Sequence, residues 1–392
     1  MRIAFVCMDP GVPIFGTKGC SVHVQEVVRE FARRDAAVTV FATRSGGNRS
    51  ALPRNCDVRL LAPMAASDPA ERERHLLELN EPLCKLLPKT GPFDFVYERY
   101  SLWSFAAMEY ARAVGIPALL EVNAPLIEEQ TAVRRLIDLD HAREAAERSF
   151  HAADALIAVS SQVADYLEEW PAAHGRVHVV MNGVDVNRVR PGGSAVRRRA
   201  NDRFRIGFVG TLKPWHGLDV LVDAFARIHR SSPQSQLLVV GTGPEGPALV
   251  TDLLQRGLLG ATELTGAVAR DLVPALLASM DVAVAPARSG EHYYFSPLKI
   301  FEYMAAGLPI VAARIGQIAE IIEHEVNGLL CEPGDGMDMA LAIDRLRRDP
   351  ALGARLGAAA RETVVKSHTW AHTVDRILDL VRASQANRRV EV

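Results

Sequence analysis

The sequence predicts an α/β protein made of two Rossmann-like, doubly wound parallel-sheet domains that face each other across a cleft. Short apolar runs, as long as buried strands, alternate with segments of helical periodicity, which is the pattern of βαβ units. The alternation restarts after an arginine-rich segment at residues 186–205. The chain has 392 residues, more than one hydrophobic core comfortably holds, and this favours two domains.

The N-terminal half opens with a βαβ unit. Residues 2–6 and 38–42 are apolar runs, and residues 20–34 between them have helical periodicity. Gly16 and Gly19 lie in the first loop and let a ligand approach the backbone there; the alternative is that they only make the turn. The glycine spacing is not that of a dinucleotide site and no acid follows the second strand, which argues against an NAD enzyme.

The rest of this half continues the same alternation. Further strands are expected at residues 58–61, 94–97, 118–122, 155–159 and 177–180, and helices at residues 71–87, 104–114 and 128–153. Asn123 follows one of these strands, at the sheet edge where ligands of parallel sheets bind; ordinary Asn-Ala-Pro turn chemistry is the alternative. The charged helix at residues 128–153 is expected to be a solvated surface, with a platform for an anionic acceptor or a membrane surface as the alternative.

The segment at residues 186–205 separates the halves. It contains seven arginines together with Pro191, Gly192 and Gly193, a composition typical of a solvated linker, with contact to anionic lipid as the alternative. After it, strands are expected at residues 205–209, 237–240, 263–264, 282–285 and 310–312. Glycine loops follow the first two of these strands, and Lys213 and His216 lie in the first loop.

Residues 296–307 predict one short helix with both ends marked. Ser296 is expected to cap the N-terminus, Pro297 to occupy the first helical position and Gly307 to take the left-handed position after the last turn. Lys299 in the first turn opposes the helix dipole unless an anion binds there. A phosphate at this tip, with Glu302 one turn deeper for ribose hydroxyls, is one reading; an ordinary surface helix with a Lys299–Glu302 ion pair is the other.

Composition excludes several classes. Hydrophobic residues make up 48% and charged residues 23%, as in ordinary globular proteins, and the net charge of −2 gives no general attraction to nucleic acid. Five scattered cysteines without a CxxC pair indicate neither a disulfide framework nor a zinc site and fit a reducing cytoplasm. We expect no signal peptide and no membrane-spanning segment.

Several motifs occur together in a specific order. They are Gly16 to Gly19 with His23, and the segments at residues 181–185, 209–217, 240–244, 296–309, 327–330 and 333–335. With these motifs the chain resembles, over essentially its whole length, the retaining GT-B glycosyltransferases of the group 1 family (glycosyltransferase family four). The resemblance implies an acceptor-binding domain at residues 1–190 and a nucleotide-sugar-binding domain at residues 191–369, with a helix at about 370–392 that packs back on the first domain.

The resemblance also implies residue roles. Glu302 matches the glutamate that binds the donor ribose, the backbone at residues 295–298 matches the amides around the sugar and diphosphate, and Asn123 stands where many members have a histidine beside the transferring sugar. Residues and resemblance together assign donor binding to Gly210, Thr211, Lys213, His216, Gly241, Gly243, Val268, Phe295, Ser296, Pro297, Leu298, Lys299 and Glu302, the acceptor side to Gly16, Gly19, His23 and Asn123, and catalysis to Lys299, Glu302, His216 and Asn123.

Three departures from the family pattern stand out. Tyr294 occupies the position of the first of two family glutamates, which leaves the sugar open. Thr211 and His216 stand where the family has Arg and Lys, with Lys213 as a displaced cation. If His216 binds the diphosphate as an imidazolium, donor affinity should weaken above its pKa. Asn123, finally, is not a general base.

The expected function is therefore retaining transfer of a sugar from a nucleotide-diphosphate sugar to a glycan, a lipid-linked or a small-molecule acceptor. The leaving phosphate takes the acceptor proton, and no cofactor or metal is required. Family frequency favours UDP, with GDP as the runner-up. The alternatives are a nucleotide-sugar 2-epimerase and a non-catalytic donor-binding partner subunit. We expect a cytoplasmic protein, with peripheral contact at the inner membrane face as a further alternative.

Overall fold

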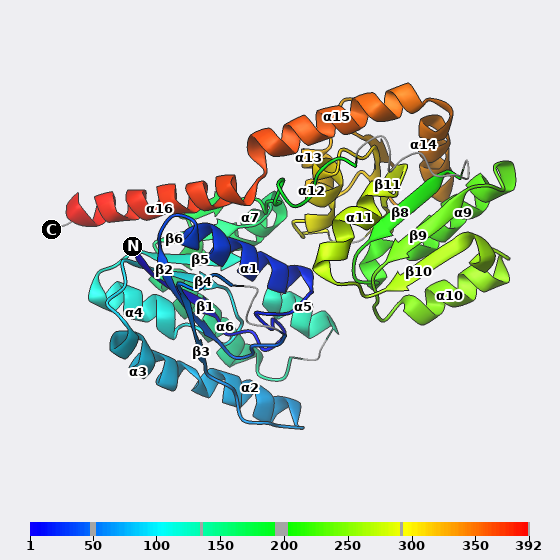
Figure 1. Cartoon of the computed structure of the whole chain (residues 1–392). Helices are drawn as coiled ribbons and strands as arrows, with labels where there is room; N and C mark the ends of the chain where they lie inside the picture. The colour runs from blue at the N-terminus through cyan, green and yellow to red at the C-terminus, as the bar shows by residue number, and fades with distance from the viewer. Residues whose placement is uncertain (48–51, 134–135, 193–202, 291–292, 391–392) are drawn as a thin grey trace. The chain divides into compact units, whose positions relative to one another are not determined.

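The structure, a computed structural model, describes residues 1–47, 52–133, 136–192, 203–290 and 293–390. The chain forms two compact units (Figure 1). Unit 1 comprises Met1–Asn182, Tyr294–Ser296 and Trp370–Val392, and unit 2 comprises Gly183–Tyr293 and Pro297–Thr369.

Unit 1 contains a seven-stranded sheet in the order β3-β2-β1-β4-β5-β6-β7, in which every pair of neighbours is parallel. The strands are β1 (Arg2–Cys7), β2 (Ala37–Ala42), β3 (Cys56–Leu60), β4 (Phe95–Arg99), β5 (Ala118–Val122), β6 (Ala155–Ala158) and β7 (Val177–Val179). The strand order reverses between β1 and β4, and the carboxyl ends of strands at such a reversal are the usual ligand position in doubly wound sheets.

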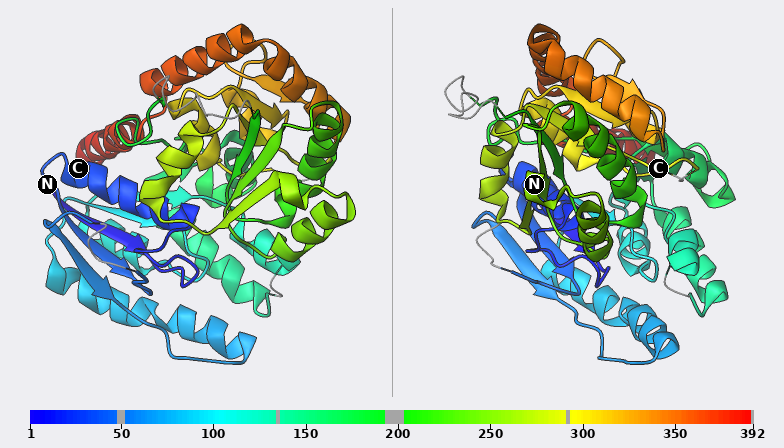
Figure 2. Two further views of the ribbon diagram at one scale, coloured as in Figure 1. Left: turned by 45° about the vertical axis from the view of Figure 1, so that its right-hand side comes forward. Right: turned by 90° about the vertical axis from the view of Figure 1, so that its right-hand side faces the viewer.

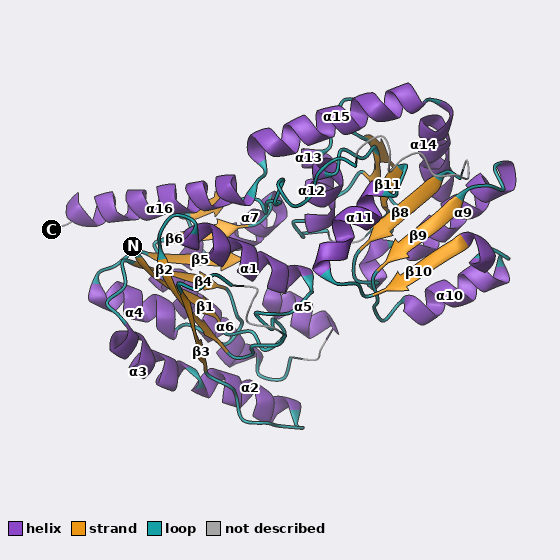
Figure 3. Cartoon of the chain, in the orientation of Figure 1, coloured by secondary structure: helices purple, strands orange, loops and turns teal. Residues whose placement is uncertain are grey.

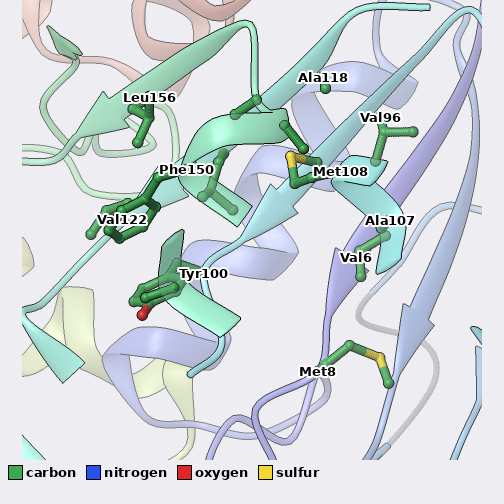
Figure 4. Close-up of a cluster of buried hydrophobic side chains, with 14 of the residues drawn as sticks. Val6, Met8, Val96, Tyr100, Ala107, Met108, Ala118, Val122, Phe150 and Leu156 are labelled. Atoms are coloured by element: carbon green, nitrogen blue, oxygen red, sulfur yellow. The ribbon is translucent and has the colours of Figure 1, made fainter. Parts of the chain in front are cut away.

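Helices cover both faces of this sheet (Figure 3). They are α1 (Gly19–Ala32), α2 (Pro69–Glu78), α3 (Asn80–Thr90), α4 (Ala106–Val114), α5 (Leu126–Val133), α6 (Leu139–Ala152), α7 (Ser161–Glu168) and α16 (Trp370–Val390). The C-terminal helix α16 lies beside α1 (Figure 2). Figure 4 shows the core between the sheet and helices α4 and α6, where Val96, Val122, Met108 and Phe150 are completely buried.

Two predicted helices of unit 1 are each divided in the structure. The helix expected at residues 71–87 is α2 followed by α3, because the buried Asn80 side chain accepts the N–H groups of Phe105 and Ala106 and donates to the Trp103 carbonyl. The helix expected at residues 128–153 is α5 followed by α6. Before α6, the Glu73 carboxylate accepts the N–H groups of Ile137 and Asp138, and Asp138 caps α6.

Unit 2 contains a six-stranded sheet in the order β10-β9-β8-β11-β12-β13, again parallel throughout. The strands are β8 (Arg205–Val209), β9 (Gln236–Val240), β10 (Thr262–Gly266), β11 (Val282–Ala285), β12 (Ile310–Ala313) and β13 (Leu329–Cys331). The helices are α9 (Leu218–Ser231), α10 (Gly246–Gln255), α11 (Val273–Ala278), α12 (Leu298–Ala305), α13 (Gly316–Ile321), α14 (Gly336–Arg348) and α15 (Pro350–Ser367). The order reverses between β8 and β11, so the prediction of two doubly wound parallel sheets is confirmed.

The described part of the predicted linker packs on unit 2. Val189 is completely buried, and the Arg361 guanidinium of α15 donates to the carbonyls of Val186 and Val189. The expectation of a solvated linker is therefore wrong for this part. The arginines at 197, 198 and 199 and Gly193 lie outside the described residues, as do Arg134 and Arg135 of the charged platform.

Within the described ranges, no helix combines the length and the apolar character needed to cross a bilayer.

Candidate functional site

The N-terminus of α12 has no side-chain cap. The helix begins at Leu298, and its N-cap residue is Pro297. The prediction that Ser296 caps the helix is wrong, because its hydroxyl oxygen instead accepts the N–H of Asn182 at 3.3 Å and its carbonyl accepts the Asn182 side-chain amide at 3.2 Å. The first-turn N–H groups of α12 thus keep their capacity to bind an anion.

The other end of α12 is firmly held. Gly307 takes the left-handed conformation as predicted, with φ 65°. The Arg361 guanidinium donates to the Ala305 carbonyl at 2.6 Å, which satisfies one of the free carbonyls of the last turn. The buried Tyr303 hydroxyl accepts the Val209 N–H at 2.8 Å and so fixes the helix to the end of β8.

Lys299 is a half-buried cation at the N-terminus of α12. Its Nζ lies 4.2 Å from the centre of the Phe208 ring, and burial lowers the pKa of the ammonium group to about 7. Among the residues that the structure describes, no carboxylate pairs with it. Among the described residues, Lys299 and Glu302 do not form the ion pair that the alternative predicted. Glu302 Oε1 instead lies 3.8 Å from an Arg188 guanidinium nitrogen.

His216 lies close to Lys299 but is not a cation. Its Nδ1 donates to the Thr211 carbonyl at 2.6 Å. Burial, with the charges of Lys299 and Lys213, lowers the pKa of the imidazole to about 3, against the weaker opposing effect of the Thr211 hydrogen bond. This low pKa argues against an imidazolium at His216 in the ligand-free protein, and the part of His216 in donor binding stays a prediction. Lys213 points its Nζ over the Trp215 ring at 5.3 Å.

The loops after β8, β9 and β10 are hydrogen-bonded to one another through the main chain. The bonds join Gly210 N to Val240 O, Leu212 N to Thr242 O and Gly241 N to Gly266 O. Glycine is required at three places: Gly210 has a positive φ of 152°, and a Cβ would lie 2.0 Å from the Gly210 carbonyl oxygen at Gly241 and 2.2 Å from the Leu212 carbonyl oxygen at Gly243. Val268 lies in the loop after β10 and is half-buried. We call these three loops, after β8, β9 and β10, the loop layer.

In unit 1, the predicted glycine loop packs against α1. The buried Gln25 amide donates to the carbonyls of Ile14 and Gly16, and a Cβ at Gly16 would lie 2.6 Å from the Ser21 hydroxyl. Gly16 therefore has a packing reason of its own, while Gly19 is the exposed first residue of α1.

His23 and Asn123 meet at a residue that the sequence analysis did not select. His23 is 2% exposed, and its Nε2 lies 3.1 Å from Glu121 Oε2. The Asn123 side-chain amide donates to Glu121 Oε1 at 2.7 Å. Because His23 is buried, it is linked to Asn123 through the Glu121 carboxylate. The sequence signal that could have identified Glu121 is its position as the one acidic residue in the apolar run at residues 118–122.

The phenol of Tyr294, the residue at the position of the family glutamate, donates to Glu129 Oε2 at 2.9 Å. The Tyr294 carbonyl accepts the Ser160 hydroxyl at 2.6 Å, and Ser160 also caps α7. Burial, followed by the neighbouring Glu129 charge, raises the pKa of the phenol, so Tyr294 is a neutral hydrogen-bond donor.

The described residues contain no group of His, Cys, Asp and Glu that could hold a metal ion.

Comparison with known proteins assigns both halves of the chain. Residues 203–349 match the model of the glycosyl transferases group 1, and residues 17–188 match that of glycosyltransferase family 4. The D-inositol 3-phosphate glycosyltransferase of Saccharomonospora viridis is 30% identical over 95% of this chain and 91% of that protein. A glycogen synthase of Mycobacterium tuberculosis is 29% identical over 55% of this chain and 51% of that protein.

Solved structures agree in fold. Sucrose-phosphate synthase from Thermosynechococcus elongatus has a TM-score of 0.78 at 21% identity, covering 98% of this chain and 99% of that one. Anabaena HepE in complex with UDP and glucose has a TM-score of 0.75 at 21% identity, covering 97% and 99%. The chain therefore belongs to the group 1 glycosyltransferases of glycosyltransferase family 4, retaining enzymes with the GT-B fold.

Proposed function

We propose that this glycosyltransferase transfers a hexose from a UDP-sugar, and that unit 2 binds the donor with its diphosphate at the N-terminus of α12. The observation that carries the proposal is Lys299. A half-buried ammonium group without a carboxylate partner among the described residues, next to uncapped N–H groups, is costly unless an anion binds beside it. A diphosphate has the charge and the size to satisfy all of these donors.

The remaining donor contacts follow from the same elements. The Glu302 carboxylate, one turn into α12, accepts the ribose hydroxyls, and the backbone at residues 295–298 faces the sugar and phosphates. The loop layer at Gly210, Thr211, Gly241, Gly243 and Val268 holds the base side. Anabaena HepE, solved with UDP and with UDP-glucose, supports uracil as the base. Lys213 remains a second cation available to the diphosphate.

The reaction needs no protein nucleophile. The C1–O bond to the diphosphate breaks, a bond from C1 to an acceptor hydroxyl oxygen forms on the same face, and the hydroxyl proton passes to the departing phosphate oxygen. Lys299 and the α12 amides stabilise the charge that develops on the diphosphate. Asn123, His23 and the loop at Gly16 and Gly19 belong to the acceptor side, in unit 1.

A cavity in unit 1 supports a small, anionic polyol as the acceptor. It has a volume of about 150 Å³, lies at the carboxyl ends of β1 and β4, and is lined by Asp9, Arg72, Ser101, Trp103 and Gln130 among others. Arg72 has no ion-pair partner among the described residues, so its guanidinium is available to a phosphate or carboxylate. The relatives named D-inositol 3-phosphate glycosyltransferase favour a phosphorylated cyclic polyol.

The site of action that we propose is the cytoplasm. All five cysteines are free thiols, as a reducing compartment requires. Peripheral contact with the inner membrane face would follow only from a lipid-linked acceptor.

The experiment is a binding and transfer screen of the full chain. Calorimetry with UDP, GDP and ADP should give tightest binding to UDP, and Lys299→Ala should abolish it without lowering the melting temperature. Incubation of UDP-glucose or UDP-N-acetylglucosamine with D-inositol 3-phosphate should yield an α-linked product by NMR. Formation of an epimer from donor alone would favour a 2-epimerase, and tight binding with neither transfer nor hydrolysis would favour a non-catalytic partner subunit.

A further inference from the structure

Glu121 is a buried carboxylate in the middle of the unit 1 sheet. It is 2% exposed and has four polar neighbours: Tyr97, Arg99, His23 and Asn123. Residues two apart on a strand share a face, so Tyr97 and Arg99 of β4 lie on the same face as Glu121 of β5, the face covered by α1, and Asn123 follows directly after β5. Burial alone would raise the pKa of Glu121, but His23, Arg99 and the Tyr97 hydroxyl together lower it to about 2.

The ionised carboxylate fixes the orientation of the Asn123 amide. A carboxylate only accepts hydrogen bonds, so Asn123 must turn its Nδ2 toward Glu121 Oε1, as the 2.7 Å contact shows. The amide oxygen Oδ1 then points away from Glu121. No other described residue donates to it, and Asn123 is half-buried at the carboxyl edge of the sheet.

We propose that Glu121 is a positioning residue for glycosyl transfer, and that it holds Asn123 so that Oδ1 accepts a hydrogen bond from a substrate hydroxyl. This inference rests on the proposed function. The hydroxyl belongs either to the acceptor or to the transferred sugar, since both present the same chemistry. A neutral acceptor oxygen at this position can hold a hydroxyl in place but does not remove its proton.

Burying the charge of Glu121 inside the sheet costs free energy, and a purely structural role does not explain this cost. An apolar residue at position 121 would match the neighbouring strand residues Leu120 and Val122, which are completely buried. Instead, the fold supplies donors from α1, from β4 and from the loop after β5 to keep one charge inside the sheet. Replacement of such buried polar clusters by apolar residues is often neutral or stabilising, so stability alone does not account for Glu121.

The test compares Glu121→Gln with a matched control, Glu98→Gln. Glu98 is completely buried one strand away, but it lies on the opposite face of the sheet and accepts the Ser104 hydroxyl instead of Asn123. In Glu121→Gln the new amide can donate, so Asn123 can turn its own NH₂ group toward the substrate. We expect kcat/KM to fall about 10–100-fold in Glu121→Gln and to change less than about threefold in Glu98→Gln.

A double-mutant cycle then separates positioning from simple support of the fold. If Glu121 acts through Asn123, Glu121→Gln should cost nothing further in an Asn123→Ala background. Glu121→Asp keeps an acceptor-only group and should retain more activity than Glu121→Gln, although it is smaller. Equal cost of Glu121→Gln in both backgrounds, or unchanged kcat/KM in Glu121→Gln, would overturn the proposal. If Glu121→Gln does not fold, Glu121→Asp takes its place in the cycle, with the same criterion.

Two readouts identify the hydroxyl. If Glu121→Gln loses UDP-glucose hydrolysis in the absence of acceptor, the hydroxyl belongs to the transferred sugar. If Glu121→Gln loses only transfer onto D-inositol 3-phosphate, the hydroxyl belongs to the acceptor. If the wild type neither hydrolyses nor transfers, the proposed function fails, and the amide orientation is tested separately. In protein labelled with ¹⁵N-asparagine, the Asn123 NH₂ signal should shift in Glu121→Gln and stay unchanged in Glu98→Gln; a signal unchanged in both would refute the orientation.

Discussion

The pH dependence of donor binding tests the assignment of Lys299 most directly. Its ammonium group has a pKa of about 7 because it is buried, and a bound diphosphate would favour the charged form. Binding of UDP-glucose must therefore take up a proton whenever Lys299 is neutral beforehand. UDP-glucose is the right probe because both of its phosphates stay ionised over the range tested, unlike the terminal phosphate of UDP.

The size of the effect follows from the fraction of charged Lys299. With a pKa near 7, about 3% of the side chain is protonated at pH 8.5, so affinity should be about 30-fold weaker there than at pH 6, or about 2 kcal/mol. Calorimetry in two buffers of different ionisation enthalpy should detect uptake of about half a proton at pH 7 and nearly one at pH 8.5.

Lys299→Arg is the control, because a guanidinium does not titrate in this range. Its affinity for UDP-glucose, strong or weak, should be constant from pH 6 to 8.5. A flat pH profile in the wild type, or an equally steep one in Lys299→Arg, would refute the assignment of the diphosphate to this site.

The same residue makes a prediction about stability. The folded-state pKa of Lys299 lies below the ordinary value of 10.5, so the unfolded chain binds more protons between pH 7 and 10.5 and stability should rise with pH in that window. The full shift would correspond to about 5 kcal/mol. Because part of the side chain meets solvent, we expect Lys299→Met to stabilise the protein at pH 7 by about 1–2 kcal/mol in urea unfolding while it abolishes donor binding. A destabilised Lys299→Met would contradict this account.

Three further predictions concern the surrounding residues. Glu302→Ala should lower UDP affinity at least about tenfold and abolish transfer, as seen by calorimetry and product assay, without altering the circular dichroism spectrum; full activity would remove Glu302 from the site. His216→Asn, whose amide can still donate to the Thr211 carbonyl, should keep UDP binding, whereas His216→Ala should weaken it; equal binding by both would show that the hydrogen bond is unimportant. Gly241→Ala should lower the free energy of unfolding by about 1–3 kcal/mol in urea titration, because its Cβ meets the Gly210 carbonyl; an unchanged midpoint would contradict the tight packing of the loops.

Much of the fold was predictable from residue patterns. The apolar runs and helical periodicities locate both sheets, and Gly307 marks the end of α12 correctly because a left-handed residue there is a local requirement. Helix interruptions were not predictable in this way. Asn80 divides α2 from α3 through hydrogen bonds to residues 103–106, and no local pattern contains that information.

In the candidate site, too, local sequence features were predictable and contacts between distant segments were not. Lys299 and the glycine loops could be selected because charge against a helix dipole and glycine after a strand are local features. The roles of Ser296, His216 and Glu121 depend on what each side chain meets in the fold. Ser296 contacts Asn182, burial keeps His216 neutral, and Glu121 acquires neighbours from α1 and β4 only through the register of the sheet.

The way in which the loops of unit 2 hold one another has a consequence for how such enzymes diverge. Gly210, Leu212 and Gly241 are joined to Val240, Thr242 and Gly266 by peptide groups alone. Peptide groups are the same whatever side chain they carry, so exchanges at Thr211, Thr242 or Val268 can reshape the surface that we propose faces the nucleobase while the hydrogen-bonded loops beneath it stay intact. A change from one nucleotide-sugar donor to another would then need only a few substitutions at these positions, while Gly210, Gly241 and Gly243 stay unchanged.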